Sequence, residues 1–155
     1  MIYLAQYDSP LGRLMITSDE ISLLSLRFSE KSIGSMESTP SILDETCRWL
    51  DSYFNGKVPD FNLSVAPSGT PFQQRVWEEL MTISYGETVS YGDIARRINC
   101  RSAQAVGGAV GRNPVAIVVP CHRVVGADGS LTGYAYGLER KRQLLMLEKN
   151  GIRVL

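Results

Sequence analysis

The sequence predicts an α+β fold in two units: a small N-terminal unit of antiparallel strands with one helix, and a mainly helical C-terminal unit. Apolar residues alternate through residues 1–28, which is the period of half-buried strands. In most later segments they recur at helical spacing. Pro59 and Pro67 interrupt the pattern between these regions. We therefore place the units at residues 1–68, the linker included, and 69–155.

Length and composition are those of an ordinary globular protein. The chain has 155 residues, of which 44% are hydrophobic and 21% charged. No run approaches the roughly 18 apolar residues that a membrane span requires, and the N-terminus has no secretion signal. The number of cysteines is odd and their spacing is wide, at Cys47, Cys100 and Cys121. This pattern favours free thiols in a reducing compartment. We expect a cytoplasmic protein, or a nuclear one in a eukaryote, with no membrane partner.

The N-terminal elements follow from turn residues and apolar spacing. Residues 1–28 predict two or three antiparallel strands, because turn residues interrupt the alternation at positions 9–12 and near Asp19. Residues 41–56 predict a helix that ends at Gly56. The apolar stripe of this helix comprises Ile42, Leu43, Thr46, Trp49, Leu50 and Phe54.

Two further helices border the C-terminal unit. Residues 70–83 predict the first, because Thr70 is a suitable N-cap and Pro71 fits the first turn. The side chains expected to face inward from this helix are Phe72, Val76, Leu80 and Ile83. Residues 138–151 predict a final amphipathic helix.

Between them, residues 90–111 predict a helix-turn-helix: a short helix capped by Ser90, a turn, and a second helix capped by Ser102. Packed helix pairs without a ligand are also common. Two features favour nucleic acid. The second helix consists of small residues that permit close backbone approach, and arginines flank the turn and the helix end, namely Arg96, Arg97, Arg101 and Arg112. A nucleic-acid surface and a ligand-free helix pair both stay open on these residues.

The formal charge is zero, but its distribution is uneven. Residues 1–84 hold 6 Lys+Arg against 11 Asp+Glu, a balance of −5, and residues 85–155 hold 10 against 5, a balance of +5. This asymmetry favours a basic C-terminal unit that faces an anionic partner, although two solvated faces would give the same counts.

Cys121 and His122 are adjacent, and His122 is the only histidine in the chain. The β-branched run 115–119 predicts a strand, which Pro120 bends or ends immediately before the cysteine. Three cysteines and one histidine without a C-x-x-C pair do not supply the ligands of a structural zinc site, which leaves only a site with carboxylate ligands. We expect no metal and no other cofactor.

The cysteine itself has two interpretations. Most buried cysteines are inert, and adjacent side chains on a regular strand point to opposite faces. At a bend, an imidazole near the thiol, directly or through one water, would take the thiol proton and leave the reactive thiolate. Glu148, in the final helix, is placed to orient the imidazole. The sequence permits this arrangement and also permits a cysteine that only fills the core.

Residues 113–148, "NPVAIVVPCHRVVGADGSLTGYAYGLERKRQLLMLE", resemble the signature of the 6-O-alkylguanine-DNA alkyltransferases, also called methylated-DNA–protein-cysteine methyltransferases. The similarity extends upstream through "TPFQQRVWEELMTISYGETVSYGDIAR" and "AVGGAVGRNP", whereas the N-terminal unit matches in length and pattern only. The resemblance implies a ribonuclease-H-like N-terminal domain and a DNA repair protein that flips a damaged base out of the duplex. Cys121 then accepts, irreversibly and once per molecule, an alkyl group from the 6-oxygen of guanine or the 4-oxygen of thymine.

The resemblance also implies the roles of five catalytic residues. Cys121 is the acceptor, and His122 relays its proton through a water with Glu148 behind it. Tyr91 donates a proton to the departing guanine. Asn113 supports the turn at the site. These roles agree with the chemistry, since displacement at a saturated carbon needs a soft nucleophile and a leaving group whose charge is met by a proton donor.

The remaining implied residues contact the base or the duplex. Contacts to the base come from backbone groups and side chains at Val124, Tyr134, Ala135 and Tyr136. The second helix enters the minor groove, and the DNA-binding residues are Arg101, Ser102, Gln104, Ala105, Gly107 and Arg112. The expected partner is double-stranded DNA that carries alkylated guanine, and the expected state is a monomer.

The chain departs from the family pattern at two positions. Gln104 stands where the family usually has the arginine that fills the gap left by the flipped base, and Tyr136 replaces the first of two glycines that close the pocket loop. The first change bears on base extrusion and the second on the size of the alkyl group.

Three alternative functions stay open. The first is a non-catalytic binder of damaged DNA, which would lack the cysteine. The others are a helix-turn-helix regulator and a cysteine hydrolase, which would turn over repeatedly.

Overall fold

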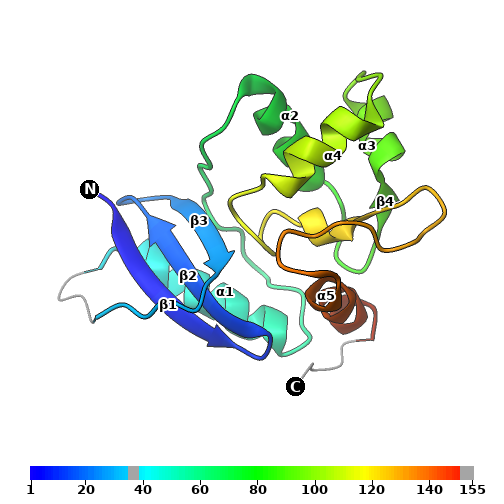
Figure 1. Ribbon diagram of the computed structural model, residues 1–155. Coiled ribbons are helices and arrows are strands. Elements are labelled where there is room, and N and C mark those ends of the chain that lie inside the picture. The colour runs from blue at the N-terminus through cyan, green and yellow to red at the C-terminus, as the bar shows by residue number, and fades with distance from the viewer. Residues whose placement is uncertain (35–38, 151–155) are drawn as a thin grey trace.

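The computed structural model describes residues 1–34 and 39–150 of the chain. A three-stranded antiparallel sheet with one helix packed on it forms the N-terminal part, and a cluster of helices forms the C-terminal part (Figure 1). The structure therefore has the α+β fold that the sequence predicts. Residue 151, where the predicted final helix ends, lies outside the described residues.

The N-terminal sheet consists of β1 (Tyr3–Ser9), β2 (Gly12–Ser18) and β3 (Leu23–Phe28), hydrogen-bonded in that order. The turn between β1 and β2 falls where the sequence places it. Gly12 ends this turn with a φ of 130°, a conformation that favours glycine. Alternate residues of β2 are buried, because a pleated strand turns every second side chain to the core.

Helix α1 (Ser41–Phe54) packs on this sheet through the predicted stripe. Of the six predicted residues only Trp49 is less than fully buried, and the buried ones are Ile42, Leu43, Thr46, Leu50 and Phe54. Tyr53 is also fully buried, which the pattern did not predict. Its ring stacks on Trp49, with 5.5 Å between ring centroids. Its hydroxyl donates to Glu148 of the C-terminal part at 2.6 Å.

The outer edge of β3 joins the two parts of the molecule. Leu23 exchanges two backbone hydrogen bonds, of 2.8 and 2.9 Å, with residues 64–66 of the linker. Leu26 exchanges two more, both of 2.9 Å, with residues 114–116. The segment that leads to Cys121 is therefore anchored to the N-terminal sheet.

The predicted strand at residues 115–119 is wrong. Val115 alone makes a bridge, to β3, and the residues after it form turns in which Ile117 has a φ of 70°. The five side chains of this segment are at most 6% exposed. The apolar composition thus reflects burial on every side rather than strand pairing. Pro120 does end the run, and Cys121–Arg123 form a 3₁₀ turn directly after it.

The helix-turn-helix is present as predicted. Helix α2 (Pro71–Leu80) leads into the region, and α3 (Tyr91–Arg97) and α4 (Ala103–Gly111) pack against each other and against α2. Each helix begins at the expected cap, whose hydroxyl accepts from a backbone N–H of the first turn: Thr70, Ser90 and Ser102. Helix α2 ends three residues earlier than expected, although Ile83 is buried.

Two strands of two residues each lie beside these helices. β4 (Val89–Ser90) pairs in parallel with β5 (Val124–Val125), which brings the start of α3 next to the segment after Cys121. Strands this short leave no periodic pattern, so the sequence did not predict them. Helix α5 (Leu138–Asn150) completes the fold. Within the described part of the chain, no helix has the length and apolar character to cross a bilayer.

Candidate active site

Cys121 lines a pocket of about 130 Å³. Its walls come from α3, from α4, from the turn before the cysteine, and from the loop at residues 133–136. Six predicted site residues line it with Cys121: Tyr91, Gly107, Asn113, Tyr134, Ala135 and Tyr136. Val124 is fully buried in β5 and is not among the lining residues. The fold thus gathers most of the predicted catalytic and substrate-binding residues around one thiol.

His122 is fully buried behind this pocket, with Nε2 2.5 Å from Oε2 of Glu148. Because a carboxylate only accepts, we assign the imidazole proton to Nε2 from the hydrogen-bond network. Nδ1 is then an acceptor. This atom is buried and has no hydrogen-bond partner among residues 1–34 and 39–150. A nitrogen of this kind is available to take a proton.

The environment sets the protonation states of both groups. Burial lowers the pKa of His122, and the hydrogen bond and charge of Glu148 oppose this only in part, so the imidazole is neutral at pH 7. Burial raises the pKa of Cys121 against smaller effects of the Asn113 amide and the Lys141 charge. The resting cysteine is therefore a thiol rather than a standing thiolate. Its proton must leave as the sulfur reacts.

Glu148 is the centre of a buried hydrogen-bond network. Its oxygens accept from Arg123 at 2.8 and 3.1 Å, from the Tyr53 hydroxyl at 2.6 Å and from the Gly86 N–H at 3.1 Å, besides His122. Burial alone would raise the pKa of Glu148, but the hydrogen bonds from His122 and Arg123, together with the charge of Arg123, hold it well below its usual range. Glu148 therefore stays ionised and fixes the orientation of the imidazole.

Asn113 shapes the turn before the cysteine. Its Oδ1 accepts from the Val115 N–H at 2.9 Å, and its Nδ2 donates to the Val119 carbonyl at 2.7 Å. The Cys121 N–H donates to the same carbonyl at 2.8 Å. The buried amide thus ties together the two ends of the turn that precedes Cys121.

Tyr91 of α3 and Lys141 of α5 hold the pocket loop by hydrogen bonds to its backbone. The Tyr91 hydroxyl donates to the Thr132 carbonyl at 3.2 Å, and its ring lies where a Cβ on Gly107 would be in ordinary contact at 3.7 Å. Lys141 is fully buried, and its Nζ donates to the carbonyls of Thr132 at 2.7 Å and Gly133 at 3.1 Å. Sequence reasoning missed Lys141, because nothing in the charged stretch "ERKR" shows which side chain turns inward.

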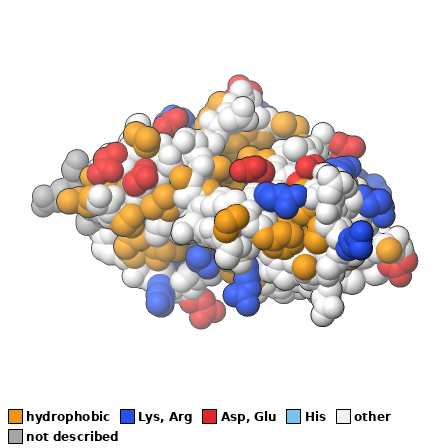
Figure 2. Space-filling model, turned by 90° about the horizontal axis from the view of Figure 1, so that it is seen from above, with side chains coloured by type: hydrophobic (Ala, Val, Ile, Leu, Met, Phe, Trp, Pro, Cys, Tyr) orange, Lys and Arg blue, Asp and Glu red, His pale blue; other side chains and the backbone are white. Residues whose placement is uncertain are grey.

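The predicted DNA-binding residues lie on or beside α4. The exposed ones are Arg101, Ser102, Gln104, Ala105 and Arg112, whereas Gly107 is half-buried and faces the pocket. Gly108 and Gly111 are exposed, and a Cβ on either would meet no atom within 4 Å. Packing inside the protein therefore does not explain these glycines. Figure 2 shows several Lys and Arg side chains on the right-hand side of the molecule, the side on which Figure 1 has the C-terminal helices.

Two of the four arginines near the turn have acidic partners. Arg96 pairs with Asp93 of the same helix, and Arg97 lies 3.7 Å from Glu79 of α2. Among residues 1–34 and 39–150, neither Arg101 nor Arg112 forms an ion pair. These two side chains are therefore the more available for an anionic partner.

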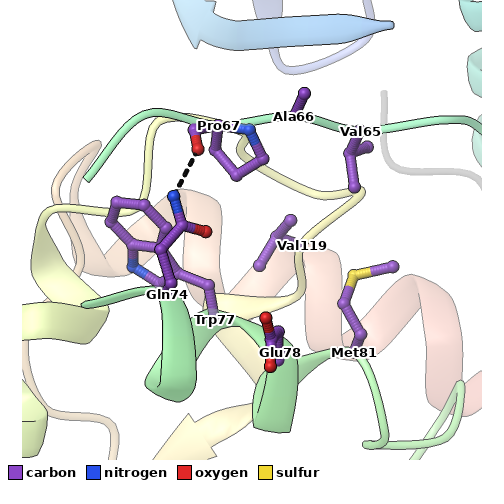
Figure 3. Close-up of a pocket in the computed structure, with 8 residues that line it drawn as sticks. All are labelled: Val65, Ala66, Pro67, Gln74, Trp77, Glu78, Met81 and Val119. Carbon is purple, nitrogen blue, oxygen red and sulfur yellow. Dashed lines mark hydrogen bonds between the residues drawn. The ribbon is translucent and has the colours of Figure 1, made fainter. Parts of the chain in front are cut away.

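A larger pocket, of about 350 Å³, lies between the linker and α2 (Figure 3). Trp77, Met81 and Val119 line it, and Gln74 donates to the Pro67 carbonyl at 2.6 Å across its rim. It contains no predicted site residue. Nowhere in the described residues does a group of three metal-ligating side chains occur. Cys121 lines the smaller pocket and not this larger one.

A helix-turn-helix lies beside a pocket that is lined by a buried thiol, and a neutral imidazole and an ionised carboxylate are buried behind that thiol. This combination is typical of a DNA-binding protein with a cysteine nucleophile. Comparison with known families agrees. The DNA binding domain of 6-O-methylguanine DNA methyltransferase matches residues 71–150, and the ribonuclease-like domain of the same protein family matches residues 2–67. The chain belongs to the 6-O-methylguanine DNA methyltransferase family.

Individual relatives match along nearly the whole chain. A methylated-DNA–protein-cysteine methyltransferase of Methanosarcina acetivorans is 45% identical over 153 residues, which cover 95% of this chain and 98% of the relative. The crystal structure of the O6-methylguanine methyltransferase of Mycobacterium tuberculosis matches with a TM-score of 0.85 at 45% identity, over 96% of this chain and 93% of that chain. The crystal structure of the OGT of M. tuberculosis in complex with DNA matches with a TM-score of 0.83 at 46% identity, over 93% of this chain and 91% of that chain. The resemblance seen in the sequence is confirmed.

Proposed function

We propose that this protein repairs DNA by transferring a methyl or other alkyl group from the 6-oxygen of guanine to Sγ of Cys121, once per molecule. The 4-oxygen of thymine is a second proposed donor. The observation that carries the proposal is the thiol in the pocket wall beside the buried pair of His122 and Glu148. Cys121 distinguishes the chain from a non-catalytic binder of damaged DNA.

In the proposed reaction the alkylated base is flipped into the pocket, because its 6-oxygen is otherwise inside the base stack. Sγ attacks the alkyl carbon in line as the C–O bond breaks, and Nδ1 of His122 takes the thiol proton through a water. The Tyr91 hydroxyl gives a proton to the departing guanine. His122 then releases its proton to solvent and Tyr91 regains one from solvent, so the net change is one S–C bond formed, one C–O bond broken and one proton moved from the thiol to guanine. The thioether is not hydrolysed, which explains the single event.

DNA is the partner, and the finer features of its binding are proposals. We propose a monomer whose α4 enters the minor groove of a duplex with alkylated guanine. The exposed small residues of α4 support this orientation. We also propose domains at residues 1–68 and 69–155, which is supported by family matches that end at residue 67 and begin at residue 71. The three free cysteines support a cytoplasmic location, or a nuclear one in a eukaryote.

The central test is the mass of the intact protein after incubation with a duplex that carries methylated guanine. We expect one methyl group per molecule, located on Cys121 by peptide mapping, and no reaction of the Cys121→Ser variant. Cys47 and Cys100 serve as internal controls, because they lie outside the pocket. A methyl group on either of them, or release of product beyond one equivalent, would contradict the proposal.

The proposed face of α4 is tested by filling it. We expect Gly108→Gln to weaken binding to duplex DNA several-fold, because the added side chain separates the helix from the groove. Gly108→Ala should weaken it less. Neither change should lower the melting temperature, since replacing glycine inside a helix by alanine stabilises by about 0.5–1 kcal/mol. Unchanged duplex affinity of Gly108→Gln, measured by fluorescence anisotropy, would exclude this face.

A further inference from the structure

Tyr136 connects the active-site pocket with the N-terminal sheet. It lines the pocket of Cys121 and also a separate surface hollow that Phe28 lines. Its ring meets the ring of Tyr134 edge-on, with 5.7 Å between centroids, and that of Phe28 at 5.2 Å and an interplanar angle of 61°. Phe28 is the last residue of β3. The Tyr136 ring therefore lies between the pocket and the sheet.

Arg140 reinforces the same contact. Its guanidinium lies 4.4 Å above the Phe28 ring, an attractive cation–π geometry. Its Nε donates to the Leu11 carbonyl at 2.9 Å, and its Nη1 donates to the Tyr136 carbonyl at 3.5 Å. A Cβ on Gly12 would lie only 2.7 Å from this guanidinium. The first hairpin of the sheet is thus built to receive Arg140.

The pocket loop is consequently held at two places by two different parts of the fold. Tyr91 and Lys141 of the C-terminal part fix the carbonyls at residues 132–133. The N-terminal sheet contacts Tyr136. Gly133 and Gly137, with φ of 44° and 97°, bracket the segment between these attachments. Glycines give a backbone little resistance to rotation, so side-chain contacts decide where the Tyr136 ring lies.

We propose that Phe28 is a positioning residue for Tyr136, and that the N-terminal sheet thereby limits the size of the alkyl group that reaches Cys121. The inference rests on the proposed alkyl transfer. With Tyr136 in place the pocket has about 130 Å³, below the roughly 300–1,000 Å³ of sites for drug-sized ligands. Phe28 lies on the side of Tyr136 away from the Cys121 pocket, because it lines only the outer hollow. Truncation of Phe28 would give the Tyr136 ring room to withdraw.

Single-turnover rates with two donors test this proposal: a duplex with methylated guanine, and free 6-O-benzylguanine. For Phe28→Ala we expect the benzyl rate, divided by the methyl rate, to rise about 10-fold over wild type, a typical effect of reshaping an apolar pocket wall. Tyr136→Gly should raise the same ratio at least as much. Phe28→Ala should add nothing in the Tyr136→Gly background, because a positioning residue acts only through its partner.

Phe72→Ala is the matched control, since it removes a partly buried ring of α2 that lines neither the pocket nor the hollow; its ratio should equal that of wild type. Phe28→Leu keeps apolar volume without the aromatic contact and replaces Phe28→Ala if that variant does not fold. Two results would overturn the inference, provided that the wild-type protein becomes alkylated on Cys121. The first is a Phe28 variant with the wild-type ratio of benzyl to methyl rate. The second is a double variant in which the effects of the two substitutions are independent. A wrong proposed function would give a different result, because the wild-type protein itself would then gain no methyl group.

Discussion

The His122→Ala variant is expected to transfer alkyl groups about 10²–10⁴-fold more slowly than wild type at pH 7, the range for loss of a general base. Cys121 is a thiol at this pH, because burial raises its pKa. Nδ1 of His122, which has no hydrogen-bond partner in the described part of the chain, would take its proton. Single-turnover quenched assays on a methylated duplex measure the loss. Duplex affinity should stay constant, because His122 is fully buried and does not reach the DNA-facing surface.

The pH dependence separates proton transfer from simple damage to the site. Burial holds the pKa of His122 below 6.5, so the wild-type rate should be level near neutrality and fall only in acid, where the imidazole becomes protonated. Without His122 the rate should instead climb with pH into the alkaline range, as the thiolate of Cys121 forms. A variant with the wild-type rate at pH 7 would show that His122 is not the base.

The Glu148→Gln variant is expected to lose about 3–5 kcal/mol of unfolding free energy at pH 7, the usual result of removing one partner of a buried ion pair. The change leaves the guanidinium of Arg123, whose side chain is 10% exposed, without its counter-charge. It also disturbs the hydrogen bonds from Tyr53 and His122. Urea denaturation followed by circular dichroism measures the difference.

Glu139→Gln is the matched control, because Glu139 lies in the same helix and pairs with Arg142 at the surface; little change is expected there. The folded pKa of Glu148 is depressed, so its contribution is fully present above its ordinary pKa of 4.5 and is lost as the pH falls toward the folded value. The difference in unfolding free energy between wild type and Glu148→Gln should therefore become smaller below pH 4.5. If Glu139→Gln and Glu148→Gln lose the same unfolding free energy at pH 7, the proposed role of the Glu148 network in stability is wrong.

Features with local causes could be predicted from the sequence. Thr70, Ser90 and Ser102 begin their helices as expected, because an N-cap depends on a hydroxyl and the next three residues. The first hairpin turn and the apolar stripe of α1 follow from equally local patterns. The resemblance located Cys121, His122 and Glu148 together, and the structure places the latter two in direct contact.

Features that depend on tertiary packing could not be predicted. Residues 115–119 have strand composition but lie in buried turns, because the anchoring to β3 outweighs their local preference. Tyr53 is one aromatic in an amphipathic helix, and nothing local shows that its hydroxyl reaches Glu148. Lys141 is buried among charged neighbours that stay nearer the surface. Residues 115–119 and Tyr53 are placed by partners far away in the chain, and Lys141 is placed by the carbonyls of the pocket loop.

The bridge between β3 and the segment before the cysteine has a consequence for how the protein matures. Leu26 and Val115, which form it, stand 89 positions apart in the chain. Contacts between such distant residues close large loops and form slowly compared with local ones. During synthesis β3 emerges long before its partner at residue 115. The reactive thiol therefore gains its environment only after nearly the whole chain has left the ribosome, so an unfinished chain has no assembled acceptor to consume.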